Sequence, residues 1–392
     1  MSKIVFFCIP AYGHTNPTLG VVRELTARGH EVRYYSYEPM RTLIEAAGAQ
    51  FVACDPYDCE QHLTPADGAR IGKDIAFSTH ILVETTLALD EMVCADMRAY
   101  APDCIVADSM AVWGKAVAKK LGIPFISSTT TFAFNRFSAK VIGQNGAGFL
   151  QFLLAQPRIN RQLKRLRAAG YTAKSVFDII ANDNETETVV YTSPDFQPCA
   201  DTFSEKYHFV GPLLRPAQSS FEKLPGRSLI YISLGTVNND ALPFYRACLA
   251  AFGGDPRFQL VLSAGTQTDL AALGPIPENC TVRASVDQMA VLDCADVFLT
   301  HCGMNSASEG LWHGLPLVLY PQTPEQHGVA NRVAALGAGV PLTDPSADGI
   351  RRAVKTALTD PSYRENAQKL AGGFRRCGGA AEAADAIEHA VN

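Results

Sequence analysis

Short apolar runs alternate with helix-like stretches along almost the whole chain, and this alternation restricts the fold more than any other feature of the sequence. In the first half, strands are expected at residues 4–8, 31–36, 50–53, 104–107 and 124–127, and helices at 17–28, 39–47, 71–100 and 112–121. The run Ile4-Val5-Phe6-Phe7-Cys8 is apolar throughout, which is typical of a parallel strand buried on both faces. Alternation at these lengths predicts a parallel sheet with helices on both faces.

The alternation breaks at residues 210–228, where proline, glycine and serine are frequent, and then restarts. The second half has expected strands at 229–233, 259–262, 280–282, 297–300 and 315–319, and helices at 242–252, 288–292, 305–312 and 325–336. We expect a domain at 1–212, a linker at 213–228, a second domain at 229–370 and a C-terminal helix at 371–392 that could pack back on the first domain. Two doubly wound halves would leave a cleft at the carboxyl ends of both sheets, where such folds bind ligands.

Composition excludes several classes of protein. The formal net charge of the 392 residues is −5, without a run of five like charges, which disfavours a nucleic-acid groove. The apolar N-terminal run stops at a Gly/Pro turn, so it does not resemble a signal peptide, and no stretch is long enough for a membrane span. The 11 cysteines form no CxxC pair. We therefore expect a cytoplasmic protein with reduced thiols.

One group of residues has the chemistry of metal ligands, although its spacing matches no common zinc pattern. It consists of Cys54, Asp55, Asp58, Cys59 and His62. No Asp-x-Asp pair is present elsewhere to hold a divalent ion. We expect neither a metal nor another cofactor.

The segment from Thr300 to Glu309 is expected to run from a buried strand into a helix. Gly303 would allow close approach of the backbone to a ligand, and Asn305 and Ser306 lie at the helix opening, where N–H groups and the helix dipole favour a phosphate. His301 could donate to the same phosphate, and Glu309, one turn further, would suit a ribose diol. Spacing alone leaves open a plain capped helix in which His301 and Glu309 are satisfied locally.

A histidine and an aspartate lie just after two expected strands of the first half. His14 lies in the turn after the first strand, and Asp108 ends the buried run 104–107. A histidine titrates near pH 6.5, so it can accept a proton near neutrality, and a carboxylate on its other ring nitrogen would orient it. The alternatives are an exposed turn residue for His14 and a helix N-cap for Asp108.

Residue identities favour the functional interpretation at these positions. The pattern His301-x-Gly303-x-Asn305-Ser306-x-x-Glu309, with Gln288 before it and Pro321-Gln322-x-x-Glu325-Gln326 after it, resembles the nucleotide-sugar signature of the UDP-glycosyltransferases of family GT1. Gly13-His14-x-Asn16-Pro17, Phe209-Val210-Gly211-Pro212, Ile232-Ser233-Leu234-Gly235-Thr236 and Gly378-Gly379-Ala380-Ala381 also fit, most closely the bacterial macrolide and flavonoid enzymes of the YjiC type. The resemblance covers essentially the whole chain.

The resemblance implies a GT-B fold, an α/β architecture of two Rossmann-like domains facing a central cleft. It also implies an inverting, metal-independent transfer of a hexose such as glucose from a UDP-sugar, with His14 as general base oriented by Asp108. Its nucleotide-sugar positions correspond here to Ser233, Gly235, Thr236, Gln288, His301, Gly303, Asn305, Ser306, Glu309, Glu325 and Gln326. Of these, Gln288 would contact the base and Glu309 the ribose. The residues His301, Asn305, Ser306 and Thr236 would hold the diphosphate, and Glu325 with Gln326 the sugar.

Two departures from the family pattern lie beside Gln288. Many members have Trp where this chain has Ser285, and Pro where it has Asp287. The preference between uridine and deoxythymidine therefore stays open.

The acceptor site is expected in the first half, after the strand that ends near Ser128. Phe132 and Phe134 follow it on the ligand side, and aromatic walls suit flat apolar acceptors such as phenols, flavonoids and macrolides. Phe149 and Phe152, three apart on a helix, are expected in the core. The partners are thus a nucleotide sugar and an apolar small molecule, without nucleic acid or membrane span, and the protein is expected to be a monomer or weak dimer.

Three other functions fit less well. A nicotinamide dehydrogenase would need GxGxxG after the first strand, where only Gly13 is found. A nucleotide-sugar 2-epimerase has no need of a base aimed at an external hydroxyl. A non-catalytic sugar-nucleotide binder would lack His14 or Asp108.

Overall fold

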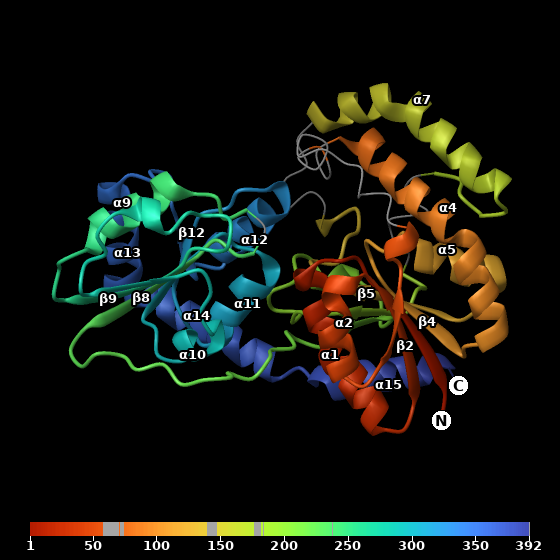
Figure 1. The fold of residues 1–392 in the computed structure, drawn as a ribbon, viewed down its shortest axis with the longest axis horizontal. Helices are drawn as coiled ribbons and strands as arrows, with labels where there is room; N and C mark the ends of the chain where they lie inside the picture. The colour runs from red at the N-terminus through yellow and green to blue at the C-terminus, as the bar shows by residue number, and fades with distance from the viewer. Residues whose placement is uncertain are drawn as a thin grey trace. The chain divides into compact units, whose positions relative to one another are not determined.

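The computed structural model describes residues 1–57, 70, 74–138, 147–175, 182, 184–236 and 238–391, with the side chains of 147–154 excepted. The expected metal-ligand residues Asp58, Cys59 and His62 therefore lie outside the described residues. The chain divides into two compact units, Met1–Leu213 with Cys377–Asn392, and Leu214–Arg376. The chain thus passes between the units twice, and each unit contains one parallel sheet (Figure 1).

The first unit contains a seven-stranded parallel sheet in the order β3-β2-β1-β4-β5-β6-β7. The strands are β1 (Lys3–Phe7), β2 (Glu31–Ser36), β3 (Gln50–Ala53), β4 (Cys104–Asp108), β5 (Phe125–Thr129), β6 (Thr188–Val190) and β7 (Tyr207–Phe209). β1 pairs with β4, and β4 with β5, so that Phe7 lies beside Ala107 and Asp108 beside Ser128. The carboxyl ends of β1, β4 and β5 therefore meet at one edge of the sheet.

Helices cover both faces of this sheet (Figure 1). One face, with Val5 and Phe7, packs against α4 (Ile75–Tyr100), α5 (Val112–Leu121) and α7 (Ala147–Ala168). The other face, with Ile4 and Phe6, packs against α1 (Tyr12–Ala27), α2 (Arg41–Ala46) and α15 (Gly379–Val391). Because both faces are buried, every residue from Ile4 to Phe7 must be apolar, as the sequence shows.

The second unit repeats this architecture with six parallel strands in the order β10-β9-β8-β11-β12-β13. Its strands are β8 (Ser228–Ser233), β9 (Phe258–Ser263), β10 (Cys280–Arg283), β11 (Val297–Thr300), β12 (Leu317–Leu319) and β13 (Gly339–Pro341). Its helices are α9 (Leu242–Phe252), α10 (Gln288–Leu292), α11 (Met304–Trp312), α12 (Pro324–Ala335), α13 (Ala347–Thr359) and α14 (Pro361–Arg375). α9 and α13 cover one face of the sheet, and Gly310 places α11 directly against Phe298 and Leu317 on the other.

The first helix begins earlier than the sequence predicts. The helix was expected to begin at Pro17, but α1 starts at Tyr12, with Ala11 as N-cap and Pro17 inside the helix. The N–H groups of His14 and Thr15 both donate to the Ala11 carbonyl. Starting at Tyr12 gives these groups a partner, whereas Pro17 deprives the helix of only one hydrogen bond. His14 consequently lies in the first turn of α1.

The last helix belongs to the first unit. α15 packs beside α1, and its Ala383, Ala384 and Ile387 are buried with the first sheet. Arg28, after α1, pairs with both Asp385 and Glu388 of α15. The expected boundary at residue 371 falls within α14, and the chain returns to the first unit at Cys377.

Candidate functional site

The first unit holds a hydrogen-bonded group of His14, Asp108 and Thr130 at the carboxyl edge of its sheet. His14 Nδ1 lies 2.8 Å from Asp108 Oδ2 and 2.9 Å from Thr130 Oγ1. The Thr130 hydroxyl also donates to Asp108 Oδ2 at 3.4 Å, and the Met110 backbone N–H donates to the other carboxylate oxygen at 2.9 Å. The sequence predicts the contact between His14 and Asp108, and Thr130 is an addition from the structure.

The geometry fixes the imidazole of His14. The Asp108 side chain is fully buried, whereas that of His14 is 16% exposed. A buried carboxylate requires several donors, and it receives them from β1–α1, from its own turn and from the end of β5. Burial, and then the charge of Asp108, raise the pKa of the neighbouring Cys8 thiol, so Cys8 stays protonated near pH 7. With Nδ1 engaged, Nε2 is the ring nitrogen suited to exchange a proton.

Four exposed apolar side chains follow the strands of this edge in the sequence, and we call them the apolar rim: Tyr12, Met110, Phe134 and Phe137. Each is more than 40% exposed. Tyr12 follows β1, Met110 follows β4, and the two phenylalanines follow β5, so all four belong to segments that leave the carboxyl ends of three adjacent strands. Exposed large apolar side chains in such segments are candidates for contacts with a ligand.

The two phenylalanines proposed for the acceptor differ in their surroundings. Phe134 belongs to the apolar rim, with 46% of its surface exposed. Phe132 is buried, and its ring packs against Phe196 with 5.3 Å between the centroids. The ring of Phe132 therefore contributes to packing and presents almost no surface to a ligand. Phe149 and Phe152 lie in α7, where side chains are outside the described residues.

In the second unit, His301 follows β11 and lies between two glycines. A Cβ atom added at Gly235 would come within 2.6 Å of the imidazole, and one added at Gly303 would also come within 2.6 Å. Both positions must therefore lack a side chain. Burial lowers the pKa of His301 to about 4, against a small opposing effect of the Ser233 backbone. His301 is thus a neutral imidazole near pH 7, and it can offer a hydrogen bond without carrying a charge.

The turn between β11 and α11 is built to expose the start of the helix. Cys302 has a left-handed backbone (φ 64°), and its N–H donates to Thr300 Oγ1 at 3.1 Å. In the described chain no side chain caps α11, and its first turn carries no acidic residue. Asn305 and Ser306 lie in that turn and are partly exposed. Such an opening favours an anion.

Gln288 and Glu309 are hydrogen-bonded to each other, with the Gln288 amide donating to the carboxylate. The Tyr231 hydroxyl in turn donates to Gln288 Oε1 at 3.0 Å, which fixes the orientation of the amide. Burial raises the pKa of Glu309, against the lowering effects of Gln288 and of the Arg215 charge. The two residues predicted for the base and the ribose are therefore adjacent, and Tyr231 connects them to β8.

Asp287 has a structural role that explains why this chain has an acid at that position. Its carboxylate accepts hydrogen bonds from the backbone N–H groups of Gln218 and Ser219 at 2.6 and 2.8 Å. Burial disfavours the charged carboxylate, but these donors outweigh it and hold the pKa of Asp287 below its usual range. Asp287 thus attaches residues 218–219 beside Gln288. Ser285 is exposed and supplies no ring.

The remaining predicted donor residues lie at loop ends of the second unit. Ser233 ends β8 and accepts from the Gly235 N–H at 3.3 Å, while Thr236 is exposed. Glu325 is exposed in the first turn of α12, and the Gln326 amide oxygen accepts from the backbone of Gln322 and Thr323 in a capping box. Gln326 therefore stabilises the start of α12, and its amide nitrogen is the group that could reach a ligand.

Sequence reasoning missed Thr130, Tyr231 and the structural role of Gln326. Thr130 lies in a Thr-Thr-Thr run at a strand end, where a buried hydroxyl is expected to need a partner. The Thr323-x-x-Gln326 spacing is itself a capping-box pattern. Tyr231 lies within an apolar strand and carries no signal of its own.

The chain is similar to known proteins over its whole length. Residues 258–387 match the family described as the C-terminal domain of erythromycin biosynthesis protein CIII-like proteins. The chain is 30% identical over 405 residues to the uncharacterized UDP-glucosyltransferase YojK of Bacillus subtilis, covering 100% of this chain and 98% of that protein. It is 32% identical over 397 residues to the NDP-glycosyltransferase YjiC of Bacillus licheniformis, covering 98% and 96%.

A solved structure shows the same fold. The glycotransferase of kitacinnamycin superposes with a TM-score of 0.86 at 30% identity, covering 100% of this chain and 99% of that one. The fold and these relatives thus define a GT-B glycosyltransferase. The chain belongs to the glycosyltransferases of family GT1, of the YjiC type, which confirms the family and the fold predicted from the sequence.

Among the described residues, no helix is both long and apolar enough to cross a membrane. Nor do three or more His, Cys, Asp or Glu side chains in that part of the chain come together as metal ligands.

The neutral state of His301 predicts a pH-dependent stability. The pKa is 6.5 in the unfolded chain and about 4 in the folded protein, so the unfolded state binds more protons between these values. The contribution of His301 to the free energy of unfolding is fully present above pH 6.5. It is lost as the pH falls, by about 2 kcal/mol between pH 7 and pH 5. His301→Asn should remove this part of the pH dependence.

The measurement is urea unfolding of both proteins at several pH values, in a Trp113→Phe background so that Trp312 reports the second unit. The raised pKa of Glu309 contributes with the opposite sign in both proteins and cancels in the comparison. Parallel loss of stability with and without His301 would contradict the interpretation.

Proposed function

We propose that this enzyme transfers a hexose, glucose in the first instance, from a UDP-sugar to a hydroxyl of an apolar natural product or phenol, with inversion at the anomeric carbon. The observation that carries the proposal is the His14–Asp108–Thr130 group at the carboxyl edge of the sheet, from whose strands the segments of the apolar rim continue. A base that is oriented by a buried carboxylate, with exposed apolar side chains in the segments that follow the same strands, suits the deprotonation of an apolar alcohol. The names of two relatives, an uncharacterized UDP-glucosyltransferase and the glycotransferase of kitacinnamycin, support the proposal.

The proposed reaction is a single displacement. The acceptor O–H proton goes to Nε2 of His14, and the acceptor oxygen forms a bond to the anomeric carbon. The bond from that carbon to the diphosphate breaks, and its electron pair leaves with UDP. Asp108 stabilises the imidazolium, which then releases its proton to water.

The leaving diphosphate is met by neutral groups of the second unit. His301, neutral because of burial, donates a hydrogen bond, and the opening of α11 at Asn305 and Ser306 supplies backbone N–H groups and the helix dipole. We propose that Gln288 contacts the base, Glu309 the ribose, and Glu325 with Gln326 the sugar hydroxyls. Thr236, Ser233, Gly235 and Gly303 complete the loops around the phosphates.

His14→Ala should lower kcat by a factor of about 10² to 10⁴, because it removes the base. UDP affinity, measured by calorimetry, should stay close to that of the unaltered enzyme, since the nucleotide is held by the second unit. A collapse of UDP binding in His14→Ala would contradict this division of roles.

Thr130→Val should reduce kcat by about tenfold, because it removes one hydrogen bond that orients His14 while keeping the shape of the side chain. Thr130→Ser keeps the hydroxyl and serves as the matched control, with kcat near that of the unaltered enzyme. Asp108→Asn should act more strongly than Thr130→Val. Equal rates for the valine and serine variants would remove Thr130 from the positioning role.

Phe134→Ala and Met110→Ala should each raise the KM for a flavonoid or simple phenol by about tenfold, from the loss of apolar contact. The KM for UDP-glucose should not change. Ile276→Ala, which truncates an equally exposed apolar residue of the second unit, is the control. Phe132→Ala should instead lower protein stability by about 3–5 kcal/mol, because its ring is packed. Unchanged acceptor KM in both rim variants would disprove the assignment of the apolar rim.

Transfer should persist in excess EDTA. The prediction rests on the neutral donors proposed for the diphosphate and on a sequence without an Asp-x-Asp pair. Activity is followed as release of UDP and formation of the glucoside. Complete loss of activity with EDTA, restored by Mg²⁺ or Mn²⁺, would disprove the metal-independent mechanism.

A further inference from the structure

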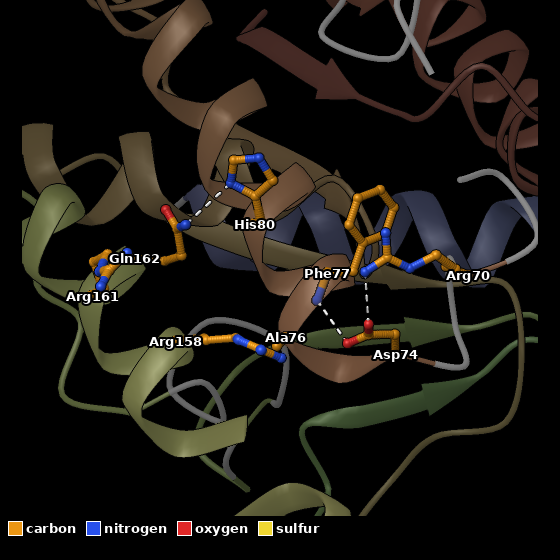
Figure 2. Close-up of a pocket in the computed structure, with 8 residues that line it drawn as sticks. All are labelled: Arg70, Asp74, Ala76, Phe77, His80, Arg158, Arg161 and Gln162. Carbon is orange, nitrogen blue, oxygen red and sulfur yellow. Dashed lines mark hydrogen bonds and ion pairs between the residues drawn. The ribbon is translucent and has the colours of Figure 1, made fainter. Parts of the chain in front are cut away.

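A cavity of about 390 Å³ lies in the first unit between the first turns of α4 and the middle of α7 (Figure 2). The described residues that line it are Arg70, Asp74, Ala76, Phe77, His80, Arg158, Arg161 and Gln162. None of the residues assigned above to the base, the donor or the apolar rim is among them. The volume is within the range of small-molecule sites.

One of the three arginines is already balanced by a carboxylate. Arg70 Nη2 lies 2.9 Å from Asp74 Oδ2, and its guanidinium stacks over the Phe77 ring at 4.1 Å. The other Asp74 oxygen accepts from the Phe77 backbone N–H at 3.0 Å. Asp74 thus neutralises Arg70 and caps α4, and both oxygens are occupied.

The other two arginines carry charge that nothing nearby balances. Arg158 and Arg161 lie three residues apart on α7, and in the part of the chain that the structure describes neither forms a hydrogen bond or ion pair. Figure 2 shows the Arg158 side chain extending from α7 toward Ala76 at the start of α4. One turn further along, Arg165 is paired with Glu84, which also contacts His80. The α4 carboxylate Glu84 and the N-cap carboxylate Asp74 are therefore already paired.

Among the other described lining residues, Ala76 and Phe77 supply apolar surface, and Gln162 Nε2 donates to His80 Nδ1 at 3.1 Å, so these two side chains hold each other in place. A cavity lined by two arginines and by apolar side chains matches a ligand that has an apolar body and an anionic end. Guanidinium geometry favours a carboxylate that can accept two parallel hydrogen bonds.

We propose that this cavity binds a small organic carboxylate through Arg158 and Arg161, with its apolar part against Phe77. The ligand is either an acidic acceptor or a separate small molecule, and both present the same chemistry to the cavity. Binding is measured without a sugar donor, so the proposal stands or falls independently of the proposed transfer reaction.

The test is calorimetry of the full chain with 3-phenylpropionate, which has no hydroxyl group and cannot be glycosylated. Arg158→Gln/Arg161→Gln should weaken binding by about tenfold or more, because two charge-assisted hydrogen-bond donors are lost at a partly exposed site. The methyl ester of the same acid should bind weakly and equally to both proteins.

Lys119→Gln/Lys164→Gln is the matched control. It removes two exposed positive charges from the same unit, one of them on α7, without changing the cavity lining. Its affinity for 3-phenylpropionate should match that of the unaltered protein. The thermal unfolding of all three proteins shows whether the fold is retained.

A second measurement identifies the source of the ligand. Transfer to 3-(4-hydroxyphenyl)propionate should show a raised acceptor KM in the Arg158/Arg161 variant if the carboxylate belongs to the acceptor. An unchanged KM, with weakened binding of 3-phenylpropionate, assigns the cavity to a separate ligand. The proposal is overturned if 3-phenylpropionate does not bind at about millimolar concentration, if the double arginine variant binds it as tightly as the unaltered protein, or if the lysine variant loses as much affinity.

Discussion

The buried carboxylate of Asp108 is the group on which the arrangement of the first unit's site depends. A charge without exposure must be compensated by donors, and here they come from the first turn of α1, from the Met110 backbone and from Thr130 after β5. These segments are far apart in the sequence and meet only because β1, β4 and β5 are adjacent in the parallel sheet. The hydrogen bond that His14 gives to Asp108 also holds the imidazole in one orientation. The contacts that stabilise the buried carboxylate are therefore the same contacts that position the proposed base.

The surroundings of His301 in the second unit differ from those of His14. His301 has no carboxylate partner in the described chain, and enclosure between Gly235 and Gly303 keeps it neutral near pH 7. A cation there would have to be desolvated, whereas a neutral imidazole and the start of α11 offer dipoles that are already oriented. The two histidines are thus made suitable for different tasks by their surroundings alone, one by a buried carboxylate and the other by its absence.

The sequence predicts the bounds of many helices and strands correctly where apolar periodicity extends over enough residues. The bounds of β2, β3, α5, α9, α10 and β11 agree with the expected ranges because apolar periodicity and flanking turn residues mark them clearly. Strands β6, β7 and β13 were not predicted, since three residues are too few to show a period. Pro17 misplaced the start of α1, because hydrogen bonds to Ala11 outweighed the usual position of a helical proline.

Single side chains were harder to predict than elements. Phe132 and Phe134 are two residues apart and have the same chemistry, yet one is packed against Phe196 and the other is exposed. Their difference depends on residues more than sixty positions away, which no local pattern encodes. Thr130 could have been found from the requirement that a buried acid needs several donors, had that requirement been applied to every polar residue after β5.

The position of α15 imposes an order on the synthesis and folding of this enzyme. Ala383, Ala384 and Ile387 complete an apolar core whose other members come from the first 210 residues. During translation that core is finished only after the whole second unit has left the ribosome, so the nascent first unit exposes an uncovered apolar surface beside α1 in the meantime. The ion pairs of Arg28 with Asp385 and Glu388 then attach the returning helix. A segment made after the whole second unit therefore completes the core of the unit that precedes it.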